Sequence, residues 1–327
     1  MGNQIETLRD VREILLTGAG GIIGQGLYRY LCKVRADYDL HFSVTLSSKS
    51  SWFSDFLPVN QRDQLLLGDL RELGEVLADS YEYIFHFAGY GQPARFQAEP
   101  LETMFINSEA VLTLRKRATR GFLYASSSEI YSGIDEAQID ESRVGATTTT
   151  HPRAPYIVSK QFGEVATLSS NLGAEGSLGK VARIALAYGP GARLDDTRVL
   201  NQLITRGLLD GEVRLMDQGA SLRTYCYVDD AVEMLTAIMF SQVQGVYNVG
   251  GISTTSIREL GEIVADQLEV PFFVSTDDNR PDSSPKNVNL NIGRVLELQP
   301  KTSFVTLEEG ISQVIGWYRM LIGSRQS

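Results

Sequence analysis

The chain has 327 residues, of which 43% are hydrophobic and 21% charged, a balance typical of a globular protein with one large or two modest domains. Its net charge of −10 argues against nucleic acid or an anionic membrane as a partner. Two cysteines are too few for a disulfide framework, and the sequence shows neither an apolar signal segment nor a membrane-spanning run. We therefore expect a cytoplasmic protein.

Apolar runs alternate with amphipathic segments through the first part of the chain. Strands are predicted at residues 14–16, 42–46, 65–67, 83–87, 122–125 and 181–186, and helices at 22–31, 101–117 and 156–172. This alternation predicts an α/β fold, a Rossmann-type doubly wound parallel sheet with helices on both faces. Ligands of such a sheet bind at the carboxyl ends of its strands.

The pattern changes after Pro190, where the segments become shorter and mixed. They lie at residues 199–208, 213–216, 223–228, 232–240 and 257–268. They predict a smaller C-terminal α+β region. We divide the chain into a dinucleotide-binding domain at residues 1–182 and a mainly substrate-binding region at 183–327, with a soft boundary that lets the chain cross back to the sheet.

A glycine cluster follows the first predicted strand. Gly18, Gly21 and Gly24 allow a tight turn and let the backbone approach a pyrophosphate, while the following helix presents its first N–H groups. Ile22 and Ile23 begin that helix. A purely structural turn is the alternative, because a glycine-rich turn alone is a weak signal.

A tyrosine and a lysine stand one helical turn apart, at Tyr156 and Lys160, so their side chains share a helix face. A nearby ammonium and a cationic cofactor ring favour the phenolate, which can remove a proton from a sugar hydroxyl. The plain alternative is an accidental pair on an exposed helix.

A serine run ends the fifth predicted strand. There Ser127 and Ser128 can hydrogen-bond a hydroxyl, and the Glu129 carboxylate can move a second proton. The plain alternative is a strand end capped by serines with a solvated glutamate. His86 is interpreted as a core residue, and no His, Cys or acidic cluster has metal-ligand spacing.

In order along the chain, the motifs at residues 17–24, 68–70, 86–89, 127–131, 156–160, 188–190 and 223–230 resemble those of the extended short-chain dehydrogenase/reductase family. This family contains nucleotide-sugar epimerases, dehydratases and decarboxylases that use NAD. The resemblance implies a catalytic set of Ser127, Tyr156 and Lys160, with Ser128 and Glu129 in a second step.

The resemblance also implies a dinucleotide site and a site for a nucleotide-diphosphate sugar. The implied cofactor contacts are Gly18, Gly21, Ile22, Ile23, Gly24, Ser47, Lys49, Asp69, Leu70, Ala88, Gly89, Tyr156 and Lys160. The implied substrate contacts are Phe96, Asn107 and Arg223. Arg198 and Arg280 can hold a diphosphate by bidentate bonds, and the plain alternative is that they are surface arginines. NAD is the expected cofactor. NADP is the alternative, because the second strand ends without an acid and Lys49 follows it.

The motifs are most similar to those of UDP-glucuronic acid decarboxylases. The Ser128–Glu129 pair and the stretches 195–199 and 218–223 carry that similarity, whereas Phe96, Leu186 and residues 132–133 depart from it. A 4,6-dehydratase, a C4 epimerase and a non-catalytic dinucleotide-binding regulator remain as alternatives. Relatives pair the helices predicted at 101–117 and 156–172 into a homodimer, which we expect here too.

Overall fold

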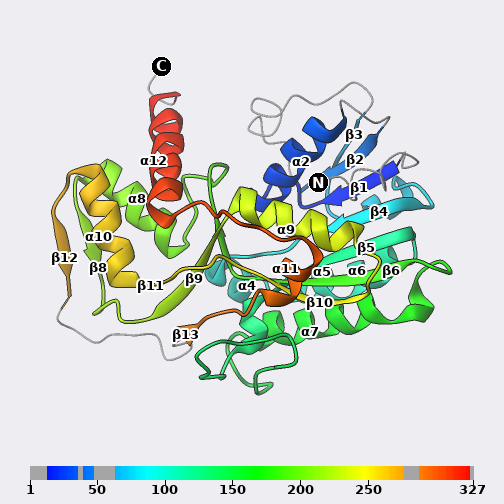
Figure 1. The fold of residues 1–327 in the computed structure, drawn as a ribbon. Helices are drawn as coiled ribbons and strands as arrows, with labels where there is room; N and C mark the ends of the chain where they lie inside the picture. The colour runs from blue at the N-terminus through cyan, green and yellow to red at the C-terminus, as the bar shows by residue number, and fades with distance from the viewer. Residues whose placement is uncertain (1–12, 36–39, 48–62, 276–286, 325–327) are drawn as a thin grey trace.

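The computed structural model describes residues 13–35, 40–47, 63–275 and 287–324. Its largest feature is a seven-stranded sheet in the order β10-β6-β5-β4-β1-β2-β3, in which every neighbouring pair is parallel (Figure 1). The strands are β1 (Glu13–Thr17), β2 (His41–Leu46), β3 (Gln64–Leu67), β4 (Tyr81–His86), β5 (Ala118–Ser127), β6 (Leu178–Ile184) and β10 (Gly245–Val249). The order runs outward in both directions from β1 and β4, which confirms the predicted doubly wound fold.

Helices cover both faces of this sheet (Figure 1). One face carries α2 (Ile22–Val34), α9 (Val228–Phe240) and α11 (Gly293–Leu298), and the other carries α5 (Pro100–Asn107), α6 (Glu109–Arg115) and α7 (Ala154–Leu168), with α4 (Pro93–Ala98) before α5. The side chains of β1 alternate between the two cores, because Ile14 and Leu16 pack in the cluster of Leu27, while Leu15 packs in the cluster of Val111. Burial on both sides explains why β1 reads as a continuous apolar run.

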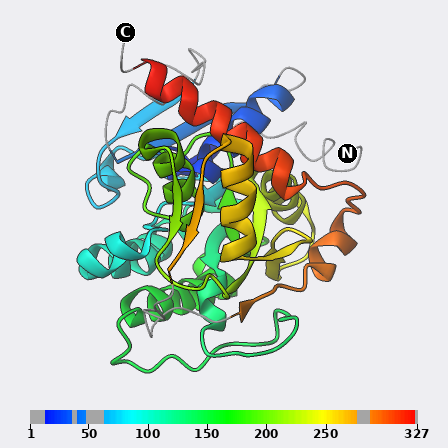
Figure 2. The same cartoon turned by 90° about the vertical axis from the view of Figure 1, so that its left-hand side faces the viewer.

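In the described residues, the smaller region contains two further sheets and three helices, and it faces the viewer in Figure 2. One sheet contains β7 (Leu186–Tyr188), β9 (Leu222–Tyr227), β11 (Thr254–Ser256) and β13 (Asn287–Val288), and the other pairs β8 (Val213–Leu215) with β12 (Phe272–Val274). The helices are α8 (Val199–Asp210), α10 (Ile257–Leu268) and α12 (Leu307–Ser324). Ser256 and Glu259 form a capping box that fixes the start of α10.

Three predicted elements differ from the structure. The helix predicted at 101–117 is two helices, because Ser108 leaves the helical region at φ −125° and ψ −76°. The helix predicted at 156–172 ends at Leu168 and is followed by a 3-10 turn, Ser170–Leu172. The strand predicted at 181–186 ends at Ile184, and the next residues form β7, which pairs with β9 instead. The apolar run at residues 184–188 crosses this change of sheet without a polar residue, so the sequence does not reveal it.

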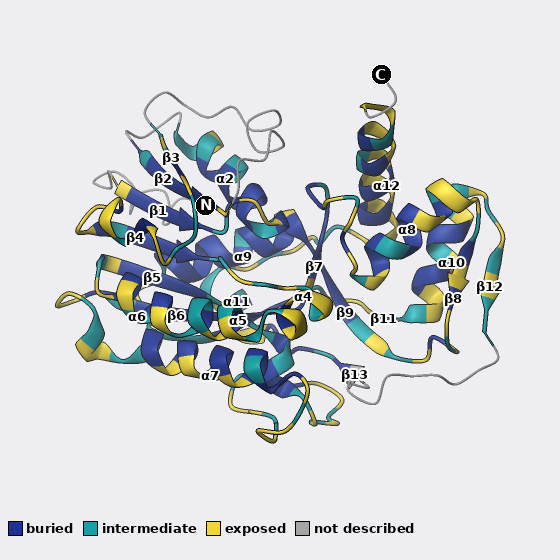
Figure 3. Ribbon diagram, turned by 180° about the vertical axis from the view of Figure 1, so that it is seen from behind, coloured by how far each residue is buried: buried dark blue, intermediate teal, exposed yellow. Residues whose placement is uncertain are grey.

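The chain returns to the main sheet after β9. Helix α9 packs on β5 and β6, and β10 adds an edge strand parallel to β6. The crossing back that the sequence left open therefore takes place at residues 228–249, while the division at 182 and 183 stays a prediction. Figure 3 shows buried residues concentrated in the strands of the main sheet. No helix in the described ranges is both long and apolar enough to cross a bilayer.

Candidate active site

The glycine turn lies between β1 and α2. Gly18 has φ +73°, and a Cβ there would lie 2.4 Å from the Ala88 nitrogen. A Cβ on Gly24 would lie 2.4 Å from the Gly18 oxygen, so the turn and the helix pack without room for side chains. Gly21 caps α2 without a side-chain hydrogen bond, and the first turn holds no acid. Ile22 and Ile23 therefore offer N–H groups without a competing anion, which fits the pyrophosphate of a dinucleotide.

Two further predicted cofactor contacts lie at strand ends. Ser47 directly follows β2 and is exposed. Asp69 follows β3, and Arg71 holds it with contacts of 2.6 Å and 2.9 Å. These hydrogen bonds lower the pKa of Asp69, which therefore stays ionised. Leu70 is half-buried beside it. Lys49 lies outside the described residues.

The end of β4 brings the backbone close to the lysine. The Ala88 N–H donates to the Thr17 hydroxyl at 3.3 Å, which ties this strand end to β1. A Cβ on Gly89 would lie 3.6 Å from Lys160 Nζ and 3.7 Å from Asn107 Oδ1. The predicted cofactor and catalytic residues therefore meet at this edge of the sheet.

Tyr156 and Lys160 lie on the buried face of α7, exposed by 6% and 4%. Lys160 Nζ donates to the Ala125 oxygen at 2.7 Å and lies 5.7 Å from the centre of the Tyr156 ring. Burial raises the pKa of Tyr156 to about 12, against a hydrogen bond with Ser127 that lowers it. Burial also lowers the pKa of Lys160 to about 7. In the chain alone, desolvation therefore outweighs the lowering of the phenol pKa that the sequence predicted.

The serine run forms a 3-10 turn, Ser128–Tyr131, at the end of β5. The Ser127 hydroxyl accepts from the Glu129 N–H at 3.2 Å, and Ser128 is buried. Glu129 forms an ion pair with Arg153 at 2.7 Å. Glu129 Oε2 and Arg153 Nε are buried without a hydrogen-bond partner in the structure. Sequence reasoning missed Arg153, although its place three residues before Tyr156 puts it one helical turn away.

Phe96 packs face to face on the Tyr156 ring, with centroids 4.4 Å apart and planes at 12°. It is 2% exposed and forms the apolar side of the phenol environment. Asn107 donates to the Ser159 hydroxyl at 3.1 Å, and its Oδ1 is buried without a partner. The predicted substrate residues Phe96 and Asn107 thus lie against the same helix as the tyrosine.

Two of the predicted substrate arginines, Arg198 and Arg223, make protein contacts in the smaller region. Arg198 forms an ion pair with Asp196 at 2.5 Å and donates to the Ala187 oxygen. Arg223 donates to its neighbouring Leu222 oxygen at 2.7 Å. Arg280 lies outside the described residues. The structure therefore shows Arg198 and Arg223 in protein contacts of the smaller region.

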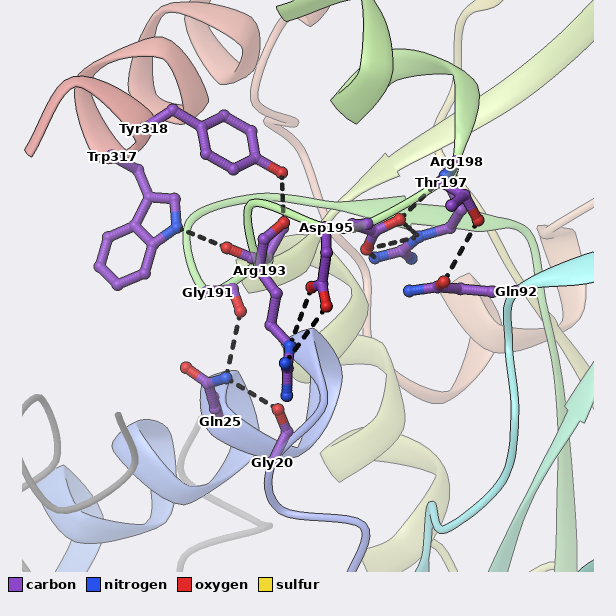
Figure 4. A network of polar contacts seen from close by, with 12 residues as sticks. Gly20, Gln25, Gln92, Gly191, Arg193, Asp195, Thr197, Arg198, Trp317 and Tyr318 are labelled. Carbon is purple, nitrogen blue, oxygen red and sulfur yellow. Dashed lines mark hydrogen bonds and ion pairs between the residues drawn. The ribbon is translucent and has the colours of Figure 1, made fainter. Parts of the chain in front are cut away.

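Residues 190–198, here called the bridging loop, join β7 to α8 and contact several elements (Figure 4). Gln25 of α2 donates to the Gly191 oxygen, and Trp317 of α12 donates to the Ala192 oxygen. Thr197 donates to Gln92 at 3.2 Å. The loop thus connects the glycine-turn helix, the C-terminal helix and the segment before α4.

Comparison with known proteins identifies the family. The sequence pattern of the NAD dependent epimerase/dehydratase family matches residues 14–250. The chain belongs to this family. A curated relative, UDP-glucuronic acid decarboxylase 6 of Arabidopsis thaliana, is 26% identical over 317 residues, covering 95% of this chain and 90% of the relative.

Solved structures of similar fold include two members with other reactions. UDP-N-acetylglucosamine 4-epimerase from Methanobrevibacter ruminantium M1 has a TM-score of 0.81 at 23% identity, covering 96% of this chain and 99% of that one. The dTDP-glucose 4,6-dehydratase from Streptomyces venezuelae, solved with NAD bound, has a TM-score of 0.80 at 22% identity, covering 95% of this chain and 98% of that one. These likenesses show the epimerase/dehydratase fold and leave the reaction open.

Other polar residues of this epimerase/dehydratase family member have structural partners. His86 is fully buried, contacts the Thr17 hydroxyl at 2.8 Å and the Ile106 oxygen at 3.1 Å, and has its pKa lowered to about 4 by burial. Arg183 forms a buried ion pair with Glu164 at 2.8 Å. Across the described ranges, no group of three or more His, Cys, Asp or Glu residues is placed to hold a metal ion.

Proposed function

We propose that this enzyme uses NAD to oxidise the C4 hydroxyl of a nucleotide-diphosphate sugar, and that it is a lyase acting as a UDP-glucuronic acid decarboxylase. The observation that carries the proposal is Tyr156, buried one helical turn from Lys160, where Ser127 lowers its pKa. A Cβ on Gly89 at the end of β4 would lie 3.6 Å from Lys160 Nζ. The Ser128–Glu129 pair and the similarity to decarboxylases along 95% of the chain support this reaction.

In the first step the Tyr156 oxygen takes the proton of the sugar O4 hydroxyl while C4 loses a hydride. When bound, NAD supplies the acceptor for this hydride and a positive ring that favours phenolate. Ser127 orients the hydroxyl. Lys160 uses one of its three N–H groups on the Ala125 oxygen, which leaves two for the cofactor ribose and the phenol.

In the second step the C4 ketone makes a C5 carboxylate a β-keto acid. The C5–C6 bond breaks, CO₂ leaves, and its electron pair passes to the C4 oxygen as an enolate. C5 then takes up a proton, and when the C4 ketone is reduced again, Tyr156 returns its proton to O4. We assign the protonation of C5 to Glu129, with Ser128 beside it. Arg153 holds the Glu129 carboxylate in place, with 2.7 Å between Arg153 Nη1 and Glu129 Oε1.

The mass of the product tests the reaction. Incubation with UDP-glucuronate should release a product lighter by CO₂, with a transient rise in reduced-nicotinamide absorbance. Loss of water from a UDP- or dTDP-hexose would make the enzyme a dehydratase, and an unchanged mass with inverted C4 would make it an epimerase. No nicotinamide reduction with any nucleotide sugar would favour the non-catalytic regulator. Titration with NAD and NADP decides the cofactor, and tighter NADP binding would refute NAD.

A homodimer is part of this proposal. Exposed apolar side chains lie on α5 and α7, namely Leu101, Met104, Val158, Phe162 and Val165. Light scattering should give a dimer mass, and Phe162→Glu should give a monomer. A monomeric wild-type chain would refute the dimer.

A cytoplasmic location is also part of the proposal. Both cysteines, Cys32 and Cys226, are free, which supports this location because disulfides are rare in the reducing cytosol. Cell fractionation tests it.

A further inference from the structure

The bridging loop is held by a row of three side-chain hydrogen bonds. Its successive carbonyl oxygens at Gly191, Ala192 and Arg193 each accept a hydrogen bond from a side chain of another helix (Figure 4). The donors are Gln25 of α2 at 3.2 Å, Trp317 of α12 at 2.9 Å and Tyr318 of α12 at 3.2 Å. Two of these donors come from the C-terminal helix, and one comes from the helix of the glycine turn.

Gln25 is the side chain that reaches both sides. Its Nε2 donates to the Gly20 oxygen at 3.0 Å and to the Gly191 oxygen at 3.2 Å, and the residue is 1% exposed. Gly191 has φ +116°, and a Cβ there would lie 3.0 Å from Gln25 Oε1. The loop therefore approaches this amide closely because position 191 has no side chain.

The far end of the loop carries Arg198, which the sequence predicts as a substrate contact. Arg198 is held by Asp196, and Thr197 donates to Gln92, which directly precedes α4. A displacement of Gly20 would change the hydrogen bonds of Gln25 and thereby the position of Gly191. One amide thus links the pyrophosphate turn to the loop that leads to Arg198.

We propose that Gln25 is a positioning residue that couples dinucleotide binding at the glycine turn to nucleotide-sugar binding at the bridging loop. The inference rests on the proposed function. A dinucleotide that orders the turn also orders the loop through Gln25, so each ligand binds more tightly in the presence of the other. Without the amide, the oxygens of Gly20 and Gly191 lose their shared donor, and the two segments move independently.

The test measures the affinity for UDP by calorimetry with and without saturating NAD. Wild type should bind UDP more tightly with NAD, by a factor on the order of 5 to 150. Gln25→Met, which keeps the side-chain length and loses the donor, should reduce this factor to about 1. The matched control is Trp317→Phe, which removes the donor to the neighbouring carbonyl but leaves Gln25 intact, and it should keep the factor.

The coupling is overturned by a wild-type factor near 1, by an unchanged factor in Gln25→Met, or by equal loss in Trp317→Phe. Hydrogen exchange of the wild-type protein gives a second measurement that needs neither a variant nor a sugar. NAD alone should slow exchange of the amides in the bridging loop, and unchanged exchange with NAD bound refutes the coupling. Failure of UDP to bind at all would count against the proposed function instead, and hydrogen exchange of wild type and of Gln25→Met with NAD would still decide the role of Gln25, because the variant should lose the slowing.

Discussion

Replacing Lys180 by methionine should stabilise the protein at neutral pH, because the fold buries this ammonium at high cost. Lys180 lies in β6, is 1% exposed, and donates to the Met239 oxygen at 2.7 Å. Burial and the positive charge of Arg115 lower its pKa from 10.5 to about 8. That lowering corresponds to roughly 3 kcal/mol of stability lost while lysine is charged in the unfolded chain.

Part of this gain is offset. Methionine leaves the Met239 oxygen without its donor, which costs about 1 kcal/mol or somewhat more. The expected net gain for Lys180→Met is therefore roughly 1–2 kcal/mol near pH 7. Between the folded pKa of about 8 and the unfolded 10.5, the unfolded chain binds more protons than the folded one. Wild-type stability therefore rises through this window, and the variant loses that rise.

Urea unfolding at several pH values and one protein concentration checks both parts. Lys116→Met serves as the control, since Lys116 is exposed and should change stability little. A Lys180→Met protein that is less stable than wild type at neutral pH, with an unchanged slope between about pH 8 and 10, would refute the reasoning.

Three more predictions concern the site. Tyr156→Phe should lower kcat by at least about 100-fold while calorimetry shows unchanged NAD affinity, and near-normal turnover would remove the phenol from the chemistry. Gly24→Ala should weaken NAD binding by about tenfold or more, because its Cβ would lie 2.4 Å from the Gly18 oxygen, and an unchanged dissociation constant would contradict the close packing. Arg153 lowers the pKa of Tyr156 and Glu129 raises it, so Arg153→Met should move the acidic limb of the kcat/KM profile to higher pH and Glu129→Gln to lower pH. Shifts in the same direction would refute this electrostatic account.

The arrangement of the main sheet was readable from the sequence because its buried strands and glycine turn leave local patterns. Ile14, Leu15 and Leu16 are apolar since both faces of β1 are covered, and Gly18 and Gly24 are glycines because other residues would clash. Such constraints fix the residue type at their own positions, even where the partner lies far away, as Ala88 does from Gly18. They therefore show in a single sequence.

What the sequence concealed depends on partners far along the chain. Nothing near Arg153 indicates its ion pair with Glu129, and Gln25 reads as an ordinary helix residue until Gly191 lies beside it. Charged residues are expected on the surface, yet Lys180 is buried, and its ammonium donates a hydrogen bond to the Met239 oxygen. The break at Ser108 was missed because the flanking helices continue the same periodicity.

The return of the chain through α9 and β10 has a consequence for how this molecule can be divided. A fragment cut after residue 182 would lack both the outermost strand beside β6 and the helix that shields one side of β5 and β6. The remaining piece would carry β10 without its partner strand β6, and the apolar face of α9 without the sheet on which it packs. Exchange of modules with relatives therefore needs a junction after β6 as well as one on either side of residues 228–249, and it has to keep α11, which packs on α9 and β10. A single splice would expose apolar surface in both halves.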